Sequence, residues 1–139
     1  MTQVLIIFAI SSLWLQGTRG NFFFELCKKC VCVCVGVKVD QTPPALLSRA
    51  GDKVQLVCSH AKTDYTLMHW YQQTPGDHAL KRIGHVYYSE IKHEESFEKH
   101  FKITGDMSGE TAKNGSLFIS DLKAPDHTAV YYCAASYAQ

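Results

Sequence analysis

The chain has 139 residues, of which 46% are hydrophobic, 19% charged and 12% aromatic, with Lys+Arg 14 against Asp+Glu 13. This length has room for one domain with a processed segment in front of it. The formal net charge of +1 excludes a strongly basic nucleic-acid binder, and the ordinary apolar fraction excludes wholesale disorder. The six cysteines are unevenly placed, because four of them lie between positions 27 and 34.

Residues 1–20 contain an apolar run from position 4 to position 10, which residues 13–15 extend. A bilayer-spanning helix needs about 20 apolar residues, so this run is too short to cross a membrane. The run and the small residues after it are typical of a secretory signal peptide, which we predict over 1–20. A buried N-terminal helix or strand is the alternative. A signal peptide implies an oxidising compartment, in which cysteines that can pair will pair.

Residues 21–35 hold the cysteine cluster, which consists of Cys27, Cys30, Cys32 and Cys34. Closely spaced thiolates can share one soft metal ion, and a C-x-x-C can act in redox chemistry. Neither pattern is complete, because no second cysteine pair and no βαβ pattern accompany it. Alternating Cys and Val is also what a translated TG repeat encodes. We therefore interpret 21–35 as a gene-model artefact or an unstructured insert, with a thiol or metal site as the third possibility.

From residue 36 onward the chain alternates apolar and polar residues over short segments, which is typical of an all-β sandwich or barrel. Strands are predicted at 54–58, 68–71, 117–119 and 130–133. Turn signals separate them, among them Thr42-Pro43-Pro44, Pro75-Gly76 and Asn114-Gly115. No stretch has a helical period long enough for a major helix.

Three residues of this region form a recognisable set: Cys58, Trp70 twelve positions later, and Cys133 near the end. Residues 126–133 (DHTAVYYC), 70–76 (WYQQTPG) and 116–122 (SLFISDL) resemble the motifs of immunoglobulin variable domains. The resemblance implies a V-type Greek-key β-sandwich over 36–139 with a Cys58–Cys133 disulfide. It also implies a core that contains Trp70, Tyr131 and Asp126, with Tyr131 as the tyrosine corner.

The resemblance extends to T-cell receptor variable segments, and best to the beta chain of fishes. It is carried by residues 62–65 (KTDY), 79–84 (ALKRIG), 112–116 (AKNGS) and 133–136 (CAAS). In that family a joining segment supplies the final strand, so the chain is expected to lack this strand. The implied role is recognition of a peptide presented by a major histocompatibility molecule, as a heterodimer with an alpha chain. Signalling subunits of the CD3 type would be reached only through downstream regions.

The resemblance also assigns surfaces. The antigen-binding loops are expected at about 62–67, at about 87–94 and from Ala134 onward, with candidate contacts Lys62, Asp64, Tyr65, Tyr87, Tyr88, Lys92 and Tyr137. Tyrosine gives a large contact area at a low entropic cost, as such loops need. Strand alternation with Trp70 inward turns the chain-pairing candidates Gln73 and Tyr132 outward, and the resemblance adds Leu80 to them. Asn114 begins an N-glycosylation sequon.

The seven histidines form neither H-x-H nor H-E-x-x-H, and no nucleophile elbow or phosphate-binding glycine loop is present. We therefore expect no enzyme, no cofactor and no histidine metal site. The expected location is the secretory pathway, and the extracellular side of the plasma membrane once the domain is joined to a constant region. The alternatives are another V-type receptor (an alpha chain, an immunoglobulin light chain or an innate receptor) and a secreted thiol or metal-binding protein.

Overall fold

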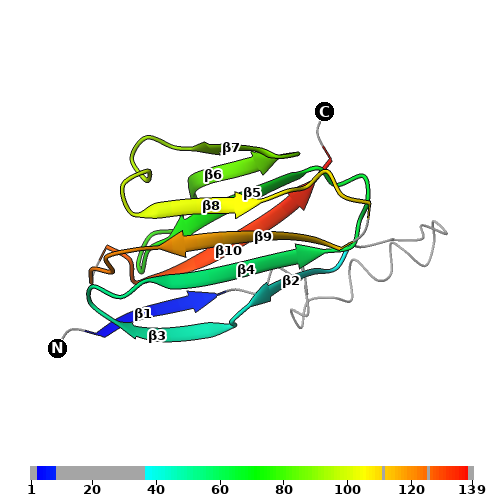
Figure 1. The fold of residues 1–139 in the computed structure, drawn as a ribbon. Helices are drawn as coiled ribbons and strands as arrows, with labels where there is room; N and C mark the ends of the chain where they lie inside the picture. The colour runs from blue at the N-terminus through cyan, green and yellow to red at the C-terminus, as the bar shows by residue number, and fades with distance from the viewer. Residues whose placement is uncertain (1–2, 9–36, 111, 125, 138–139) are drawn as a thin grey trace.

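The computed structural model describes residues 3–8, 37–110, 112–124 and 126–137, and its strands form two facing sheets (Figure 1). The larger sheet has the strand order β3-β1-β10-β5-β6-β7, and the smaller has β2-β4-β9-β8. The strands are β1 (Gln3–Phe8), β2 (Val39–Thr42), β3 (Ala45–Arg49), β4 (Val54–His60), β5 (Leu67–Gln73), β6 (Lys81–Tyr87), β7 (Glu90–His93), β8 (Phe101–Gly105), β9 (Lys113–Ile119) and β10 (Ala129–Ser136). Within the described ranges, no helix has the length and apolarity to span a membrane.

The burial pattern of the strands confirms the predicted all-β sandwich. Every second residue of β4, β5 and β9 is buried, as a sheet with one face on the core requires. These inward residues meet in one core between the sheets, in which Leu56, Trp70 and Leu117 are fully buried. The outward residues of β5 therefore form a continuous surface on the larger sheet.

The predicted Cys58–Cys133 disulfide is present and joins β4 of the smaller sheet to β10 of the larger sheet. Trp70 lies directly opposite Cys133 in the β5–β10 register, so its fully buried ring is beside the bridge. The Tyr131 hydroxyl donates a hydrogen bond to the His127 carbonyl (3.0 Å), which is the geometry of a tyrosine corner. The expected roles of Trp70 and Tyr131 in the core are therefore those that the structure shows.

A buried glutamine that the sequence analysis missed ties the two sheets together. Gln41 of β2 donates through its Nε2 to the Tyr131 carbonyl (2.8 Å), and its Oε1 accepts from the Cys133 amide (3.1 Å). Both side-chain groups are thus satisfied although the residue is only 3% exposed. The signal for Gln41 was available, because it alternates with Val39 on the buried face of β2.

The expectation that Asp126 belongs to the core is wrong. Its side chain is exposed, and the neighbouring His127 is buried instead. Asp126 contributes through its backbone, because its carbonyl accepts a hydrogen bond from Gln72 Nε2 (3.1 Å). Among the described residues, His100 has an acid within ion-pair distance in Asp121 and not in Asp126, at 4.0 Å between Nδ1 and Oδ2. Asp126 forms no ion pair with the described residues, and its carboxylate remains in water because burying an unpaired charge is costly.

The predicted turn at Asn114-Gly115 is also wrong, because both residues lie inside β9. Gly115 is opposite Cys58 of β4 and Gly105 of β8, in the centre of the smaller sheet. A Cβ at Gly115 would collide with the Met68 sulfur from the opposite sheet. The glycine therefore serves close packing between the sheets, and the Asn-Gly pair signals a turn only where the backbone is free to adopt one.

The place beside β10 is taken by β1, which comes from the segment predicted as a signal peptide. β1 pairs in parallel with β10 and antiparallel with β3, so it lies between them. The remaining residues of the leader and the whole cysteine cluster lie outside the described residues. The chain was expected to lack a final strand, and an N-terminal strand fills the place beside β10.

Candidate functional site

Three segments meet at the end of the sandwich where β4, β6 and β10 terminate (Figure 1). The first is the loop 61–66 between β4 and β5, the second is the tight turn between β6 and β7, and the third begins at Ala134 near the end of β10. The Tyr88 amide donates to the Thr66 carbonyl (2.9 Å), and the Met107 amide donates to the Tyr88 carbonyl (2.6 Å). These backbone bonds hold the first loop, the second turn and the residues after β8 against one another.

Four of the predicted contact residues are tyrosines, and the structure arranges them in two pairs at this end. The rings of Tyr65 and Tyr137 are 5.6 Å apart, and those of Tyr87 and Tyr88 are 4.8 Å apart, both edge to face. Tyr137 is 57% exposed and Tyr88 45%. The end of the sandwich thus presents accessible aromatic surface that is already ordered by ring contacts.

Tyr88 has a strained backbone, with φ 51° at the tip of the second turn. A bulky residue in the left-handed region costs of order 1 kcal/mol or more, and such residues cluster at functional sites. The two backbone hydrogen bonds of Tyr88 hold it there. The strain fixes the direction in which the Tyr88 ring leaves the turn.

Lys113 supports the first loop from below, and the sequence analysis missed it. The side chain is 1% exposed, and its Nζ donates to the carbonyls of Thr63 and Tyr65. The ammonium thereby satisfies two backbone acceptors of a loop that has no sheet to pair with. The predicted turn at Asn114 concealed this residue, whereas a strand through Lys113, Gly115 and Leu117 places it on the inward face.

The remaining loop candidates fall into two groups. Lys62 and Asp64 are exposed in the first loop and form an ion pair of 3.4 Å. Lys92 does not lie in a loop, because β7 begins at Glu90 and places Lys92 on the outer face of the larger sheet. The second binding loop is therefore shorter than predicted.

The candidate pairing residues lie on the same outer face. Gln73 and Tyr132 are half-buried and adjacent, with the Tyr132 hydroxyl donating to Gln73 Oε1 (3.0 Å). Leu80 is 52% exposed in the segment before β6. The alternation that turns Gln73 and Tyr132 outward is as predicted.

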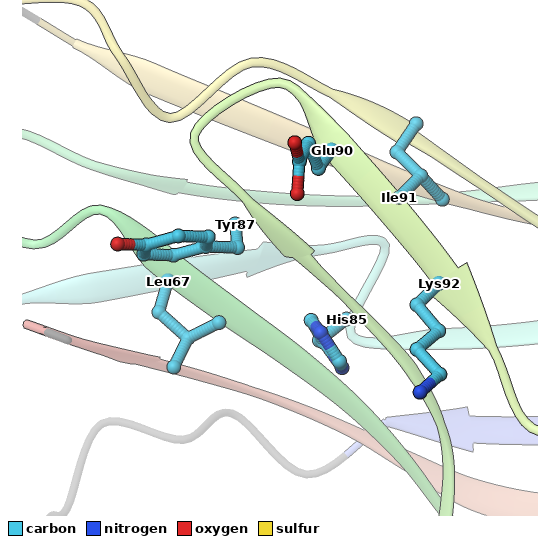
Figure 2. Close-up of a pocket in the computed structure, with 6 residues that line it drawn as sticks. All are labelled: Leu67, His85, Tyr87, Glu90, Ile91 and Lys92. Carbon is cyan, nitrogen blue, oxygen red and sulfur yellow. The ribbon is translucent and has the colours of Figure 1, made fainter. Parts of the chain in front are cut away.

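A shallow hollow of about 610 Å³ lies on this face over β6 and β7. Figure 2 shows His85 and Lys92 at one end of it, with Tyr87 and Leu67 alongside. Burial lowers the pKa of His85, and the positive charges of Arg82 and Lys92 lower it further. Burial also lowers the pKa of the adjacent His69. Among the described residues, no group of three or more His, Cys, Asp or Glu could hold a metal ion.

A model of the immunoglobulin V-set domain matches residues 41–139. The chain belongs to the immunoglobulin V-set family. The mouse T-cell receptor beta chain V region C5 is 32% identical over 98 residues, which is 70% of this chain and 75% of the relative. The human T cell receptor alpha variable 25 is 27% identical over 94% of this chain and 99% of the relative. The mouse immunoglobulin kappa variable 9-129 is 26% identical over 91% of this chain and 87% of the relative.

The solved structures agree on the fold of this V-set domain. One chain, from a study of T cell specificity and activation by the superantigen toxic shock syndrome toxin-1, superposes with a TM-score of 0.60. It is 23% identical, and the match covers 75% of this chain and 85% of the other. The predicted V-type sandwich and the likeness to T-cell receptor beta variable regions are confirmed. The V-set family is generally receptor-like and not enzymatic.

Acidification is expected to destabilise this V-set domain. Burial lowers the pKa of His127, and its Nδ1 accepts a hydrogen bond from the Lys123 amide (3.0 Å), which a protonated Nδ1 cannot do. As pH falls through the usual histidine value of about 6.5, the unfolded chain binds a proton that the folded chain resists. Stability is therefore full above that pH and is lost between it and the pKa in the folded state.

The melting temperature is measured at about pH 7.5 and at about pH 5.5, and it should be several degrees lower at the lower pH. His60, His69 and His85 contribute in the same direction, because burial lowers the pKa of each. His78→Gln, in an exposed loop, is the control and should leave the decrease unchanged. An equal melting temperature at the two pH values would contradict the prediction.

Proposed function

We propose that this V-set domain is the antigen-recognition variable region of a T-cell receptor beta-type chain. The observation that carries the proposal is the set of four ordered tyrosines, drawn from three separate segments, at one end of the sandwich. In this proposal Tyr65, Tyr87, Tyr88 and Tyr137 contact a peptide presented by a major histocompatibility molecule, with Lys62 and Asp64 at the margin. The relatives named T-cell receptor beta support the beta type.

The outer face of the larger sheet would pair with an alpha-type variable domain. Gln73 and Tyr132 form its hydrogen-bonded centre, and Leu80 offers apolar surface at its edge. A polar pair beside exposed apolar surface is the composition of a non-obligate interface. The likeness to an alpha variable segment and to a kappa variable segment favours a second candidate, another V-type receptor chain with the same pairing face.

Pairing is tested by co-expressing the chain with an alpha-type variable domain and measuring the affinity of the heterodimer. Gln73→Asp and Tyr132→Asp are each expected to weaken association about tenfold or more, because a carboxylate would be buried without a partner. Gln55→Asp is the control, since Gln55 is an exposed glutamine on the other sheet. Equal losses in all three variants, or in none, would contradict the proposed pairing face.

Antigen recognition is tested with the same heterodimer and a library of peptide-loaded major histocompatibility molecules. For a ligand so found, Tyr65→Ala or Tyr88→Ala should weaken binding by about 1 kcal/mol or more. Leu47→Ala is the control, because Leu47 is an exposed apolar residue at the other edge of the sheet. If the chain binds such a ligand only when it is paired with a V-type domain other than an alpha chain, the result favours the second candidate.

The remaining assignments belong to the same proposal. The leader 1–20 would direct the chain to the secretory pathway, and a joined constant region would hold the domain outside the plasma membrane. Asn114 is exposed on β9 and would carry a glycan, which an endoglycosidase shift detects. No catalysis and no cofactor enter this function. The cysteines of 21–35 lie outside the described residues, so a thiol or metal role for them stays a separate hypothesis for zinc titration.

A further inference from the structure

Three basic side chains form a straight row on the outer face of the larger sheet. His69 of β5 is directly opposite His85 of β6, and His85 is directly opposite Lys92 of β7. The two imidazole rings are 5.5 Å apart. We call these three residues the basic row.

A second row of mainly apolar character runs beside the basic row. It consists of Leu67, Tyr87 and Glu90, which the same strand registers place side by side. The hollow lies between the two rows, and in Figure 2 the nitrogens of His85 and Lys92 lie at one end of it. An occupant would therefore meet the basic nitrogens of His85 and Lys92 along one side, and the apolar surface of Leu67 and Tyr87 along the other, with the Glu90 carboxylate at the end of that second row.

The basic row has hydrogen-bonding capacity that the chain does not use. The Nδ1 atoms of His69 and His85 are buried and have no hydrogen-bond partner. Lys92 takes part in none of the ion pairs within the part of the chain that the structure describes. Solvent does not reach the two Nδ1 atoms, so an outside group would be bound through the exposed Lys92 ammonium and the accessible edges of the two half-buried imidazole rings.

The surrounding charges favour an anion over a metal cation. Two imidazoles would suit a divalent transition metal, but the described residues bring no third ligand to them, and the ammonium of Lys92 would repel the ion. Glu94 is engaged by Arg82 at 2.6 Å, so it does not neutralise Lys92. Arg82 also acts on both histidines and Glu94 on His85, the Tyr71 ring lies 6.0 Å from that of His69, and the Glu90 carboxylate lines the hollow.

We propose that the basic row is a docking site for a carboxylate side chain of a partner protein, whose neighbouring apolar side chain lies against Leu67 and Tyr87. The hollow lies on the face assigned to chain pairing. The inference therefore rests on the proposed function for the partner, an alpha-type variable domain that presents an aspartate or glutamate there. The preference of the site for a carboxylate is argued from the described residues alone and does not depend on which partner presents it.

The probe is the blocked peptide acetyl-Leu-Asp-Leu-amide, added to the full chain and followed by NMR of the histidine imidazoles. We expect the His69 and His85 signals to shift with a Kd in the millimolar range, as a small contact of this kind allows. The matched peptide acetyl-Leu-Asn-Leu-amide has the same shape without the charge and should bind at least about threefold more weakly. Equal binding of the two peptides, or no shift with either, would overturn the proposal.

Variants and pH provide the second test. Lys92→Gln, and the double change of His69→Gln with His85→Gln, should each weaken binding of the acidic peptide about threefold or more. Lys102→Gln, an exposed lysine on the other sheet, should leave it unchanged. Because a bound carboxylate favours protonated imidazole, the acidic peptide should bind more tightly at about pH 6 than at pH 7.5. Weaker binding at the lower pH would refute a carboxylate site, whereas the pairing test with Gln73 and Tyr132 would be unaffected.

Discussion

Replacing Cys58 with alanine is expected to lower the free energy of unfolding by about 4.5 kcal/mol. The bridge closes a loop of 75 residues, so without it the unfolded chain regains a large amount of conformational freedom. The loss is comparable with the whole stability of a small domain, which is typically about 5–15 kcal/mol. We therefore expect little folded domain to be secreted.

The measurement is urea unfolding of the secreted or refolded protein, with intrinsic fluorescence of the buried Trp70 as the signal. The double replacement of Cys58 and Cys133 by alanine is the control for a reactive free thiol, and it should lose as much stability as the single variant. Unchanged stability of Cys58→Ala would show that the bridge does not hold the sheets together.

Replacing Lys113 with methionine is expected to cost about 2 kcal/mol and to loosen the first loop. Methionine fills a similar volume but leaves the carbonyls of Thr63 and Tyr65 without their buried donor. The loss is local, so amide exchange should accelerate in residues 62–66 more than in β4 or β5. Affinity for any ligand of the loops should fall with it, because Tyr65 would no longer be pre-positioned.

Lys102→Met is the matched control, since Lys102 is an exposed lysine on the neighbouring strand β8. It should change neither the stability nor the exchange in the first loop. If Lys113→Met unfolds the whole domain uniformly, with no preferential exchange at the loop, Lys113 is a general core residue and not a support of the loop.

Much of the architecture could be predicted from local pattern. The resemblance to immunoglobulin variable domains supplied the arrangement in two sheets and the Cys58–Cys133 bridge. The alternation in β4 and β5 was sufficient for the strands and for the direction of their outward residues. These features follow from the period of a strand, which is visible in a single sequence. The tyrosine candidates at the loop end came from the resemblance to T-cell receptor variable segments.

The errors arose where tertiary packing overrides a local signal. Asn114-Gly115 is a strong turn signal, yet Gly115 lies in a strand because Met68 leaves room for no side chain there. Lys92 was assigned to a loop because a short edge strand has little pattern of its own. Asp126 was assigned to the core from the resemblance, but its side chain is exposed and forms no ion pair with the described residues.

Other features depend on which strands become neighbours, and the spacing of residues in the sequence does not reveal the strand pairing. His69 and His85 are far apart in the chain, and only the β5–β6 register brings them together. Gln41 reaches Cys133 in the same way, through the contact between β2 and β10. Motifs along the sequence therefore indicate neither the His69–His85 pair nor the hydrogen bonds of Gln41 between the two sheets.

The position of β1 has a consequence for the order of events during biosynthesis. β1 supplies the backbone partners of β3 and of one edge of β10, and it does so from the segment that we propose is cleaved on export. If a peptidase removes that segment, both neighbours lose a strand in the same event, and the edge of β10 becomes an unpaired template for other chains. The uncut precursor and the processed chain would then differ in their tendency to aggregate, although their sequences from Gly36 onward are identical.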